Sequence, residues 1–353
     1  MNHYFSTREL SELCGVGETT VKRWSNMGLI RHHKTVGRHR KFKLEDVLEF
    51  ISKNHITIPD EQLERLKLEK QSSENLDLGT EILLVKGDTE ALASRLLDSL
   101  LAYNRDEAEV LLIKAFEQNL SFAVIFDNLI APVMHSVGNL WANKRICAAE
   151  EHIISHILIE AIIRLKARYE ARLSEKHRYQ NGVATRLTVG TALHNGNGHS
   201  VGNRDVQNGE GQRTKNEPHV VVCTCPESEL HEIPLLGVAL VCQSLGFQVS
   251  YVGAAVPFKD LTQIIDEIEP EMVCMSFTTA RLDTDKYRRY EQLKRYLKKR
   301  ETRFVVGGQF LGEKKSQPIT ADCRARDCQE LEQYIRENFE VSDDALKLSG
   351  QRS

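Results

Sequence analysis

His219-Val220-Val221-Val222-Cys223-Thr224 is an apolar run that leads into the polar loop Pro226-Glu227-Ser228-Glu229-Leu230-His231-Glu232-Ile233-Pro234. This stretch opens an alternation of expected strands and helices. Further strands are predicted at 247–252, 272–277 and 303–306, and helices at 234–245, 258–268, 284–299 and 328–338. Because apolar strands that alternate with helices form a parallel sheet covered on both faces, residues 218–340 are predicted to be a doubly wound α/β domain. Ligands of such domains bind at the carboxyl ends of the strands.

The loop after the first strand is therefore a candidate site, and His231 is its most reactive side chain. Taken alone, a histidine at a strand end can be a metal ligand, a general base or the N-cap of the next helix. The residues by themselves leave these three interpretations open.

A helical region precedes this domain. The 3.6-residue periodicity predicts helices at about 89–103, 106–118, 121–142 and 147–173, with Asp88, Asp106 and Ser121 as caps. Short connections predict an antiparallel four-helix bundle over residues 88–174. Residues 56–87 are mixed and polar and are expected to be a linker. Residues 175–217, rich in glycine and asparagine, are expected to be a flexible insert, and the polar tail 341–353 is expected to be loose.

The N-terminal segment carries a concentrated positive charge. Between Thr19 and Leu44 there are eight lysines and arginines and no acid. Ser6 and Glu9 form the capping box of a helix over 8–14, a glycine turn follows, and a second helix is expected over 18–26. Two short strands at 29–33 and 39–43 and a helix at 44–53 complete a winged helix-turn-helix over residues 1–55. The candidate DNA contacts are Thr19, Thr20, Lys22, Arg23, Arg38, His39, Arg40 and Lys41.

Two other interpretations apply to this segment, since a helix-turn-helix can be a simple packing unit and a charge run can be a solvated face. The coincidence of charge, turn and hairpin favours DNA binding. Lysines and arginines would neutralise phosphates, and the second helix would enter the major groove of double-stranded DNA.

Length and composition exclude several classes of protein. The chain has 353 residues, which at about 150 residues per domain indicates two or three domains. Hydrophobic residues make up 41% and charged residues 27%, which excludes global disorder. No run of about 18 apolar residues or secretory leader is present, so no membrane association is expected. Eight cysteines without a Cys-x-x-Cys pair are typical of reduced thiols in a cytoplasmic protein.

The N-terminal segment resembles the winged-helix DNA-binding domain of MerR-type regulators. The residues that carry this resemblance are Ser6-Thr7-Arg8-Glu9-Leu10, Val21-Lys22-Arg23-Trp24 and Thr35-Val36-Gly37-Arg38-His39-Arg40-Lys41-Phe42. The family's wing more often reads Gly-Gly-His-Arg, so Arg38 stands where a glycine is usual.

The helical region carries a second resemblance. Trp141, nine intervening residues and then Glu151-His152 resemble the Trp-x9-Glu-His signature of cobalamin-binding regulators. Taken alone, Trp141 is typical of a core residue and His152 of a helix histidine without a functional role. The resemblance instead implies that the bundle caps the upper face of the corrin ring, with Trp141 against the upper axial group.

The loop after the first strand carries a third resemblance, to the Asp-x-His-x-x-Gly motif of cobalamin-binding domains of the methionine-synthase type. The resemblance implies that His231 is the lower ligand of cobalt and that Glu229 orients its ring. Glu229 replaces the motif aspartate, and Pro234 stands at the motif glycine. Further matches are Ser276, Thr278, Gly307 and Gly308, whose small side chains would leave room for the nucleotide tail of the cofactor.

The order of winged helix, helical cap and corrin-binding domain is similar to that of the cobalamin-dependent, light-responsive MerR-type repressors of carotenoid genes. This resemblance implies a non-enzymatic repressor that binds adenosylcobalamin, with methylcobalamin as the alternative, and that assembles as a dimer or tetramer on a DNA operator. Ala142 follows Trp141 where some light-responsive relatives carry a histidine. Two rival hypotheses are a corrinoid methyl-carrier protein, which would have no need of residues 1–55, and a regulator that has lost cobalamin and responds to a protein partner.

Overall fold

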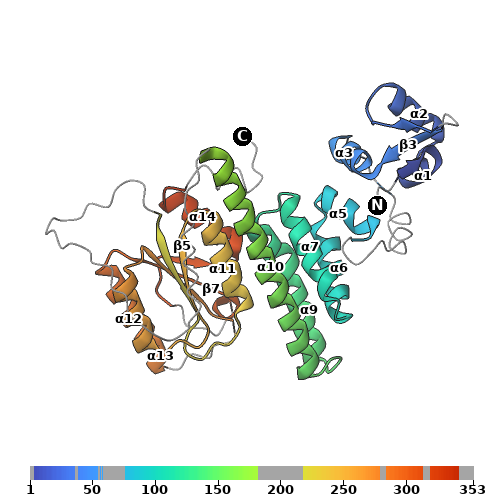
Figure 1. The fold of residues 1–353 in the computed structure, drawn as a ribbon. Coiled ribbons are helices and arrows are strands. Elements are labelled where there is room, and N and C mark those ends of the chain that lie inside the picture. Colours follow the sequence, from blue (N-terminus) through green and yellow to red (C-terminus); the bar gives the residue numbers. More distant parts are fainter. Residues whose placement is uncertain are drawn as a thin grey trace, which may run out of the picture.

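The computed structural model describes residues 4–35, 39–54, 56, 58, 76–181, 218–278, 284–312 and 319–341. They form an N-terminal unit, a helical bundle and a C-terminal α/β unit, in that order along the chain (Figure 1). Arg38 of the expected wing, the expected insert beyond residue 181 and the tail beyond residue 341 lie outside the described residues.

The N-terminal unit has three helices on a small antiparallel sheet of order β1-β3-β2. Its elements are β1 (Tyr4–Ser6), α1 (Thr7–Leu13), α2 (Glu18–Asn26), β2 (His33–Lys34), β3 (Arg40–Lys43) and α3 (Leu44–Asn54). The predicted capping box is confirmed, since Ser6 Oγ accepts from the backbone N–H of Glu9 and the Glu9 carboxylate accepts from that of Ser6. The strand β1 was not predicted, because three residues are too few to show an alternating pattern.

The bundle confirms the four expected helices. They are α6 (Thr89–Leu101), α7 (Arg105–Glu117), a continuous helix made of α8 (Phe122–Val124), η1 (Ile125–Ile130) and α9 (Ala131–Ala142), and α10 (Ala148–Asn181). The segment η1 is a turn of π-helix inside the third helix. Asp88 and Ser121 cap their helices as predicted, but α7 is capped by Asn104 instead of Asp106.

Two expectations about the flanking segments were wrong. The end of the expected linker 56–87 contains a further helix, α5 (Leu78–Lys86), capped by Asp77. Likewise α10 continues through residues 175–181, which were assigned to the insert. Those residues contain no glycine or proline, so nothing local ends the helix before Gly182.

The C-terminal unit is the predicted doubly wound α/β fold. Its five strands are all parallel, in the order β5-β4-β6-β7-β8. The elements are β4 (Val220–Thr224), α11 (Ile233–Ser244), β5 (Gln248–Gly253), α12 (Phe258–Ile268), β6 (Met272–Ser276), α13 (Thr284–Lys298), β7 (Arg303–Gly307), η2 (Gln309–Gly312), β8 (Cys323–Ala325) and α14 (Cys328–Asn338). The short edge strand β8 was missed because its three residues include an arginine and form no apolar run.

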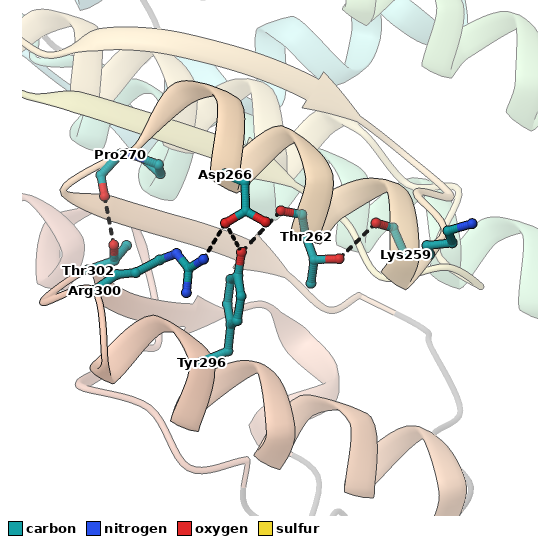
Figure 2. Close-up of polar contacts among 7 residues, drawn as sticks. All are labelled: Lys259, Thr262, Asp266, Pro270, Tyr296, Arg300 and Thr302. Carbon is teal, nitrogen blue, oxygen red and sulfur yellow. Dashed lines mark hydrogen bonds and ion pairs between the residues drawn. The ribbon is translucent and has the colours of Figure 1, made fainter.

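Helices cover both faces of this sheet (Figure 1). The helices α11 and α14 lie between the sheet and the bundle and share one apolar core with it, while α12 and α13 cover a separate core on the other face. Figure 2 shows the polar contact that joins α12 to α13. Tyr296 and Arg300 both donate hydrogen bonds to Asp266, and the Arg300 guanidinium lies 3.8 Å from the centroid of the Tyr296 ring.

The π-helical turn η1 makes the junction between the bundle and the α/β unit. The ring of Phe126 lies against Gly237 of α11, where an added Cβ would come 2.5 Å from a ring carbon. The neighbouring Asp127 carboxylate accepts hydrogen bonds of 2.9 Å from the backbone N–H groups of Cys328 and Gln329, at the first turn of α14. A carboxylate at a helix N-terminus satisfies otherwise unpaired donors. The bundle is therefore fixed to two helices of the α/β unit.

The eight cysteines are all free thiols. Cys223, Cys242 and Cys274 are buried in the core that the sheet shares with the bundle. Within the described ranges, no helix has the length and apolar character needed to cross a membrane.

Candidate functional site

The candidate site lies where the connections of the sheet diverge. The strand β4 leads to α11 on the bundle face, while its neighbour β6 leads to α13 on the opposite face. Open α/β sheets bind ligands in the crevice at this switch point. The loop that contains His231 follows β4, and Thr278 follows β6, so both lie at the switch point.

One buried carboxylate ties these two loops together. Glu229 is 0% exposed, and its Oε2 accepts a 2.8 Å hydrogen bond from the backbone N–H of Thr278. Its Oε1 accepts a 3.0 Å hydrogen bond from the backbone N–H of His231 and lies 2.5 Å from Nδ1 of the same residue. A buried carboxylate is stable only when such donors satisfy it. Glu229 therefore fixes the position of the His231 ring relative to the end of β6.

His231 is presented to solvent by this arrangement, with 54% of its side chain exposed. The hydrogen bond to Glu229 is the main reason why the pKa of His231 is raised, and the nearby Glu151 carboxylate of the bundle adds to it, against the opposing effect of burial. Because an ionised Glu229 requires Nδ1 to donate, a metal at this ring would be bound by Nε2. This is the carboxylate–histidine arrangement that orients metal ligands in proteins.

Pro234, which replaces the motif glycine, lies in the first turn of α11. Proline is well tolerated at that position, since its missing N–H would have no partner inside the helix. Glu232, the N-cap residue of α11, holds the loop after β5 by accepting a 3.0 Å hydrogen bond from the backbone N–H of Ala254. The motif loop thus keeps a regular connection to α11 despite the proline.

The other expected cofactor residues of this domain gather at the ends of β6 and β7. Ser276 is buried at the end of β6, and Thr278 follows it with a buried Oγ1 that has no hydrogen-bond partner among the described residues. Gly307 ends β7 and Gly308 follows it, and an added Cβ on Gly308 would come 2.2 Å from the carbonyl oxygen of Phe277. The glycine at 308 is therefore required by the close approach of two backbones. Contact of either glycine with a nucleotide tail stays a prediction.

The expected residues of the cap lie at the end of α9 and the start of α10. Trp141 is 54% exposed, so it is not the core residue that its type alone suggests. Glu151 is half-buried and accepts a 2.8 Å hydrogen bond from Ser155 Oγ, while His152 is exposed beside it. The Glu151 carboxylate, at the start of α10, contributes to the raised pKa of His231. Contact between these residues and a cofactor stays a prediction.

The residues present fit the corrinoid that the resemblance implies. In the described part of the chain, no three His, Cys, Asp or Glu side chains converge to hold a metal ion. A corrin ring carries its own equatorial nitrogen ligands, so a single oriented histidine is sufficient. The unpartnered Oγ1 of Thr278 offers a polar contact beside it, and exposed Trp141 and Leu230 offer apolar surface to a large flat ring.

The candidate DNA-binding face lies on α2 and the adjacent hairpin. Thr19, Lys22 and Arg23 are exposed on one side of α2, and Thr20 is half-buried. Lys22 pairs with Glu18 at 3.3 Å, and Arg40 donates a 2.7 Å hydrogen bond to Asn26 at the end of α2. His39 and Thr35 close the hairpin through two hydrogen bonds, and Lys41 lies on β3. Seven of the eight expected residues are thus brought to one region, and Arg38 lies outside the described residues.

Sequence reasoning missed several residues that shape the site. Leu230 is 75% exposed between the two motif residues, and Tyr251 at the end of β5 is 37% exposed. An apolar residue inside an otherwise polar loop was the available signal for Leu230. Phe126 and Asp127 set the position of the cap, but nothing in a helical periodicity reveals a π turn.

Three parts of the chain match models of known protein families. The family model of the helix-turn-helix domain matches residues 4–55, and two models of B12 binding domains match residues 92–166 and 219–329. The HTH-type transcriptional repressor CarH of Myxococcus xanthus is 23% identical over 282 residues, which cover 78% of this chain and 79% of that protein.

Two solved structures are also similar. The monomethylamine corrinoid protein of Methanosarcina barkeri is 15% identical with a TM-score of 0.47, over 70% of this chain and 99% of that one. A cobalamin-binding protein from Desulfitobacterium hafniense is 16% identical with a TM-score of 0.31, over 70% of this chain and 97% of that one.

The fold and the matches define a class: this is a multidomain chain that joins a helix-turn-helix domain to a helical and an α/β B12-binding domain. The resemblance carried by the sequence motifs is confirmed at this level, and it is that of a B12-binding helix-turn-helix regulator.

Proposed function

We propose that the protein is a cobalamin-dependent transcriptional repressor whose binding to a double-stranded DNA operator depends on the bound cofactor. The observation that carries the proposal is the Glu229–His231 pair at the switch point of the sheet, within electrostatic reach of Glu151 in the cap. The matches to a helix-turn-helix domain and two B12 binding domains in one chain support it. The functional units are proposed to span residues 1–55, 88–174 and 218–340.

In this proposal, His231 would bind the cobalt of a corrinoid through Nε2, and Glu229 would hold the His231 ring in place through Nδ1. A bound corrinoid would supply a cobalt centre with an exchangeable ligand. The nucleotide tail of the cofactor would be held by Ser276, Thr278, Gly307 and Gly308, with Thr278 Oγ1 as a hydrogen-bonding group. From the bundle, the corrin ring would be contacted by Trp141, Glu151 and His152.

The DNA-binding face of the proposal consists of Thr19, Thr20, Lys22, Arg23, Arg38, His39, Arg40 and Lys41. Side chains of α2 read base edges in the major groove, and the hairpin residues neutralise phosphates. Binding of the cofactor can change DNA affinity only if one arrangement of the protein binds it better than another. A change in self-association, between monomer and dimer or tetramer, is the proposed difference between those arrangements.

Adenosylcobalamin is the proposed form of the cofactor, with methylcobalamin as the alternative, and light is proposed to change the assembly. Ala142 follows Trp141, so His135, His152 or water would have to bind the cobalt after illumination. Size-exclusion chromatography in the dark and after green illumination tests this part. The proposal predicts a smaller species and weaker DNA binding after light. Equal elution and DNA binding in both conditions would leave a cobalamin sensor without a light response.

Two rival functions are distinguished by simple measurements. A corrinoid methyl carrier would bind cobalamin but no DNA, and the basic face on α2 disfavours it. A regulator that responds to a protein partner would bind DNA but remain colourless with added cobalamin, and Pro234 at the motif glycine is the observation that motivates it. The first-turn position of Pro234 in α11 weakens this alternative.

The experiment that tests the proposal uses the full chain purified with and without adenosylcobalamin. The protein selects a DNA sequence from a random duplex library, and its affinity for that sequence is measured in both states. A red protein whose DNA affinity changes with cofactor supports the proposal. A colourless protein, or equal affinities in the two states, would contradict it.

A further inference from the structure

The helix α5 lies in a segment between the regions that the family models match. The helix-turn-helix match ends at residue 55 and the next match starts at residue 92, whereas α5 spans Leu78–Lys86. Its centre reads Ile82-Leu83-Leu84, and all three side chains are buried. Three consecutive buried apolar residues cannot all face one neighbour on a helix, because successive residues are about 100° apart.

These three residues belong to two different cores. Ile82 is 0% exposed and belongs to the core of the DNA-binding unit, together with residues such as Leu10, Val47 and Ile51. Leu83 and Leu84 belong to the core that the bundle shares with the α/β unit. Ile82 and Leu84 point to nearly opposite sides of α5, about 200° apart. The helix α5 packs on α3 on one side and on α6 on the other.

Polar contacts fix α5 on the bundle side. The buried Asp77 caps the helix by accepting from the backbone N–H of Thr80 at 3.0 Å and from its hydroxyl at 2.6 Å. Asp77 also pairs with Arg95 of α6 at 3.5 Å, and Glu81 pairs with Lys114 of α7 at 3.7 Å. The helix α5 is therefore anchored to the bundle by charge and apolar packing, and it reaches the DNA-binding unit through the buried Ile82.

We propose that α5 is the joint that fixes the DNA-binding unit to the bundle, with Ile82 as the positioning residue. A displacement of the cap then rotates or releases the DNA-binding unit, because the two cores share this helix. Coupling between two sites requires an element whose arrangement both sites influence. The helix α5 would be that element, because it contacts both the bundle and the DNA-binding unit. The role in transmission rests on the proposed function, whereas the role in fixing the unit does not.

The first test measures the joint without any ligand, by hydrogen exchange of the full chain. The variant Ile82→Ala removes the apolar contact, Ile82→Val largely preserves it, and Lys86→Ala changes an exposed residue of the same helix. We expect Ile82→Ala to accelerate exchange in α3 as well as α5, with α7 and the sheet unchanged and with wild-type exchange in the other two variants. Unchanged exchange of α3 in Ile82→Ala would overturn the proposal that α5 fixes the DNA-binding unit to the bundle. So would equal acceleration throughout the DNA-binding unit and the bundle, which would indicate general unfolding.

The second test measures transmission, as the ratio of DNA affinities with and without adenosylcobalamin. Coupling between sites is typically about 5–150-fold, and we expect Ile82→Ala to reduce the wild-type ratio towards one while the cofactor spectrum is retained. Ile82→Val and Lys86→Ala should keep the wild-type ratio. A full ratio in Ile82→Ala would overturn the role in transmission. A ratio of one in the wild-type protein would contradict the proposed function instead, and the exchange experiment would still decide whether the joint exists.

Discussion

The ring of Phe126 occupies the space where a side chain at Gly237 would begin, 2.5 Å from the position of an added Cβ. This contact sets the distance between the bundle and α11, the helix that follows the His231 loop. Because Phe126 lies in the π turn η1 next to Asp127, one turn of irregular helix supplies both the close packing and the cap of α14. π turns inside helices are often found at functional sites.

The first prediction follows from this contact. Gly237→Ala should destabilise the protein by about 1–3 kcal/mol, because a core that is already filled must shift to accept the methyl group. Gly138→Ala is the matched control, since Gly138 is also helical but has nothing within 4 Å of an added Cβ. That change should stabilise by about 0.4–1 kcal/mol. Chemical unfolding measures both changes in stability. Equal effects of the two substitutions would show that the bundle does not pack closely against α11 at Gly237.

The second prediction concerns the pKa of His231. Its hydrogen bond to Glu229 raises this pKa above the ordinary 6.5, with a smaller contribution from Glu151. In an NMR titration of the cofactor-free protein, Glu229→Gln should lower the pKa strongly and Glu151→Gln should lower it slightly. If Glu151→Gln leaves the pKa of His231 unchanged, the Glu151 carboxylate at the start of α10 does not interact with the His231 ring.

The same shift predicts how stability depends on pH. Because the folded pKa of His231 is higher than the unfolded one, protonation favours the folded state. The stabilisation is complete below the unfolded pKa near 6.5 and is lost as the pH rises through the higher folded pKa. His231→Ala should therefore cost more stability in mildly acidic than in alkaline solution, as measured by unfolding at several pH values. The opposite pH dependence would mean that the sign of the shift is wrong.

The third prediction concerns DNA binding. Arg23→Ala should weaken binding and reduce the slope of log affinity against log salt by roughly one unit, because one phosphate contact is lost. Arg40→Ala should have at least the same effect, since Arg40 also holds Asn26 at the end of α2. Arg8→Ala is the control, because Arg8 lies exposed on α1 and pairs with Glu12. If Arg8→Ala changes the slope as much as Arg23→Ala does, the binding face is not the one on α2.

Much of this architecture was predictable because it rests on local signals. The bounds of α2, α12 and α14 match the ranges expected from apolar periodicity, and the Ser6–Glu9 capping box is visible in four residues of sequence. The helix α5 was missed because it is short and apolar on two sides, a pattern that only two neighbouring cores explain. The strand β8 forms because β7 offers it an edge to pair with, so its own sequence shows no strand pattern.

The candidate site was predictable in part for the same reason. Glu229 and His231 are two residues apart, so their contact could be expected from a motif. The hydrogen bond from Thr278 to Glu229 connects residues that are 49 apart in the sequence. The contribution of Glu151 to the pKa of His231 comes from a different domain. Such relationships depend on the strand order and on the seating of the bundle, which no local pattern encodes.

Binding of the cobalt of a corrinoid by His231, whose ring Glu229 orients, is measured by the visible absorption spectrum of the protein with adenosylcobalamin. The wild-type protein should show the spectrum of a cobalamin whose cobalt is bound by a histidine in place of the cofactor's own nucleotide base. Glu229→Gln should keep that spectrum with an affinity lower by about 10–100-fold. His231→Ala should lose both the spectrum and most of the affinity. A His231→Ala protein that retains the wild-type spectrum would show that His231 does not bind the cobalt.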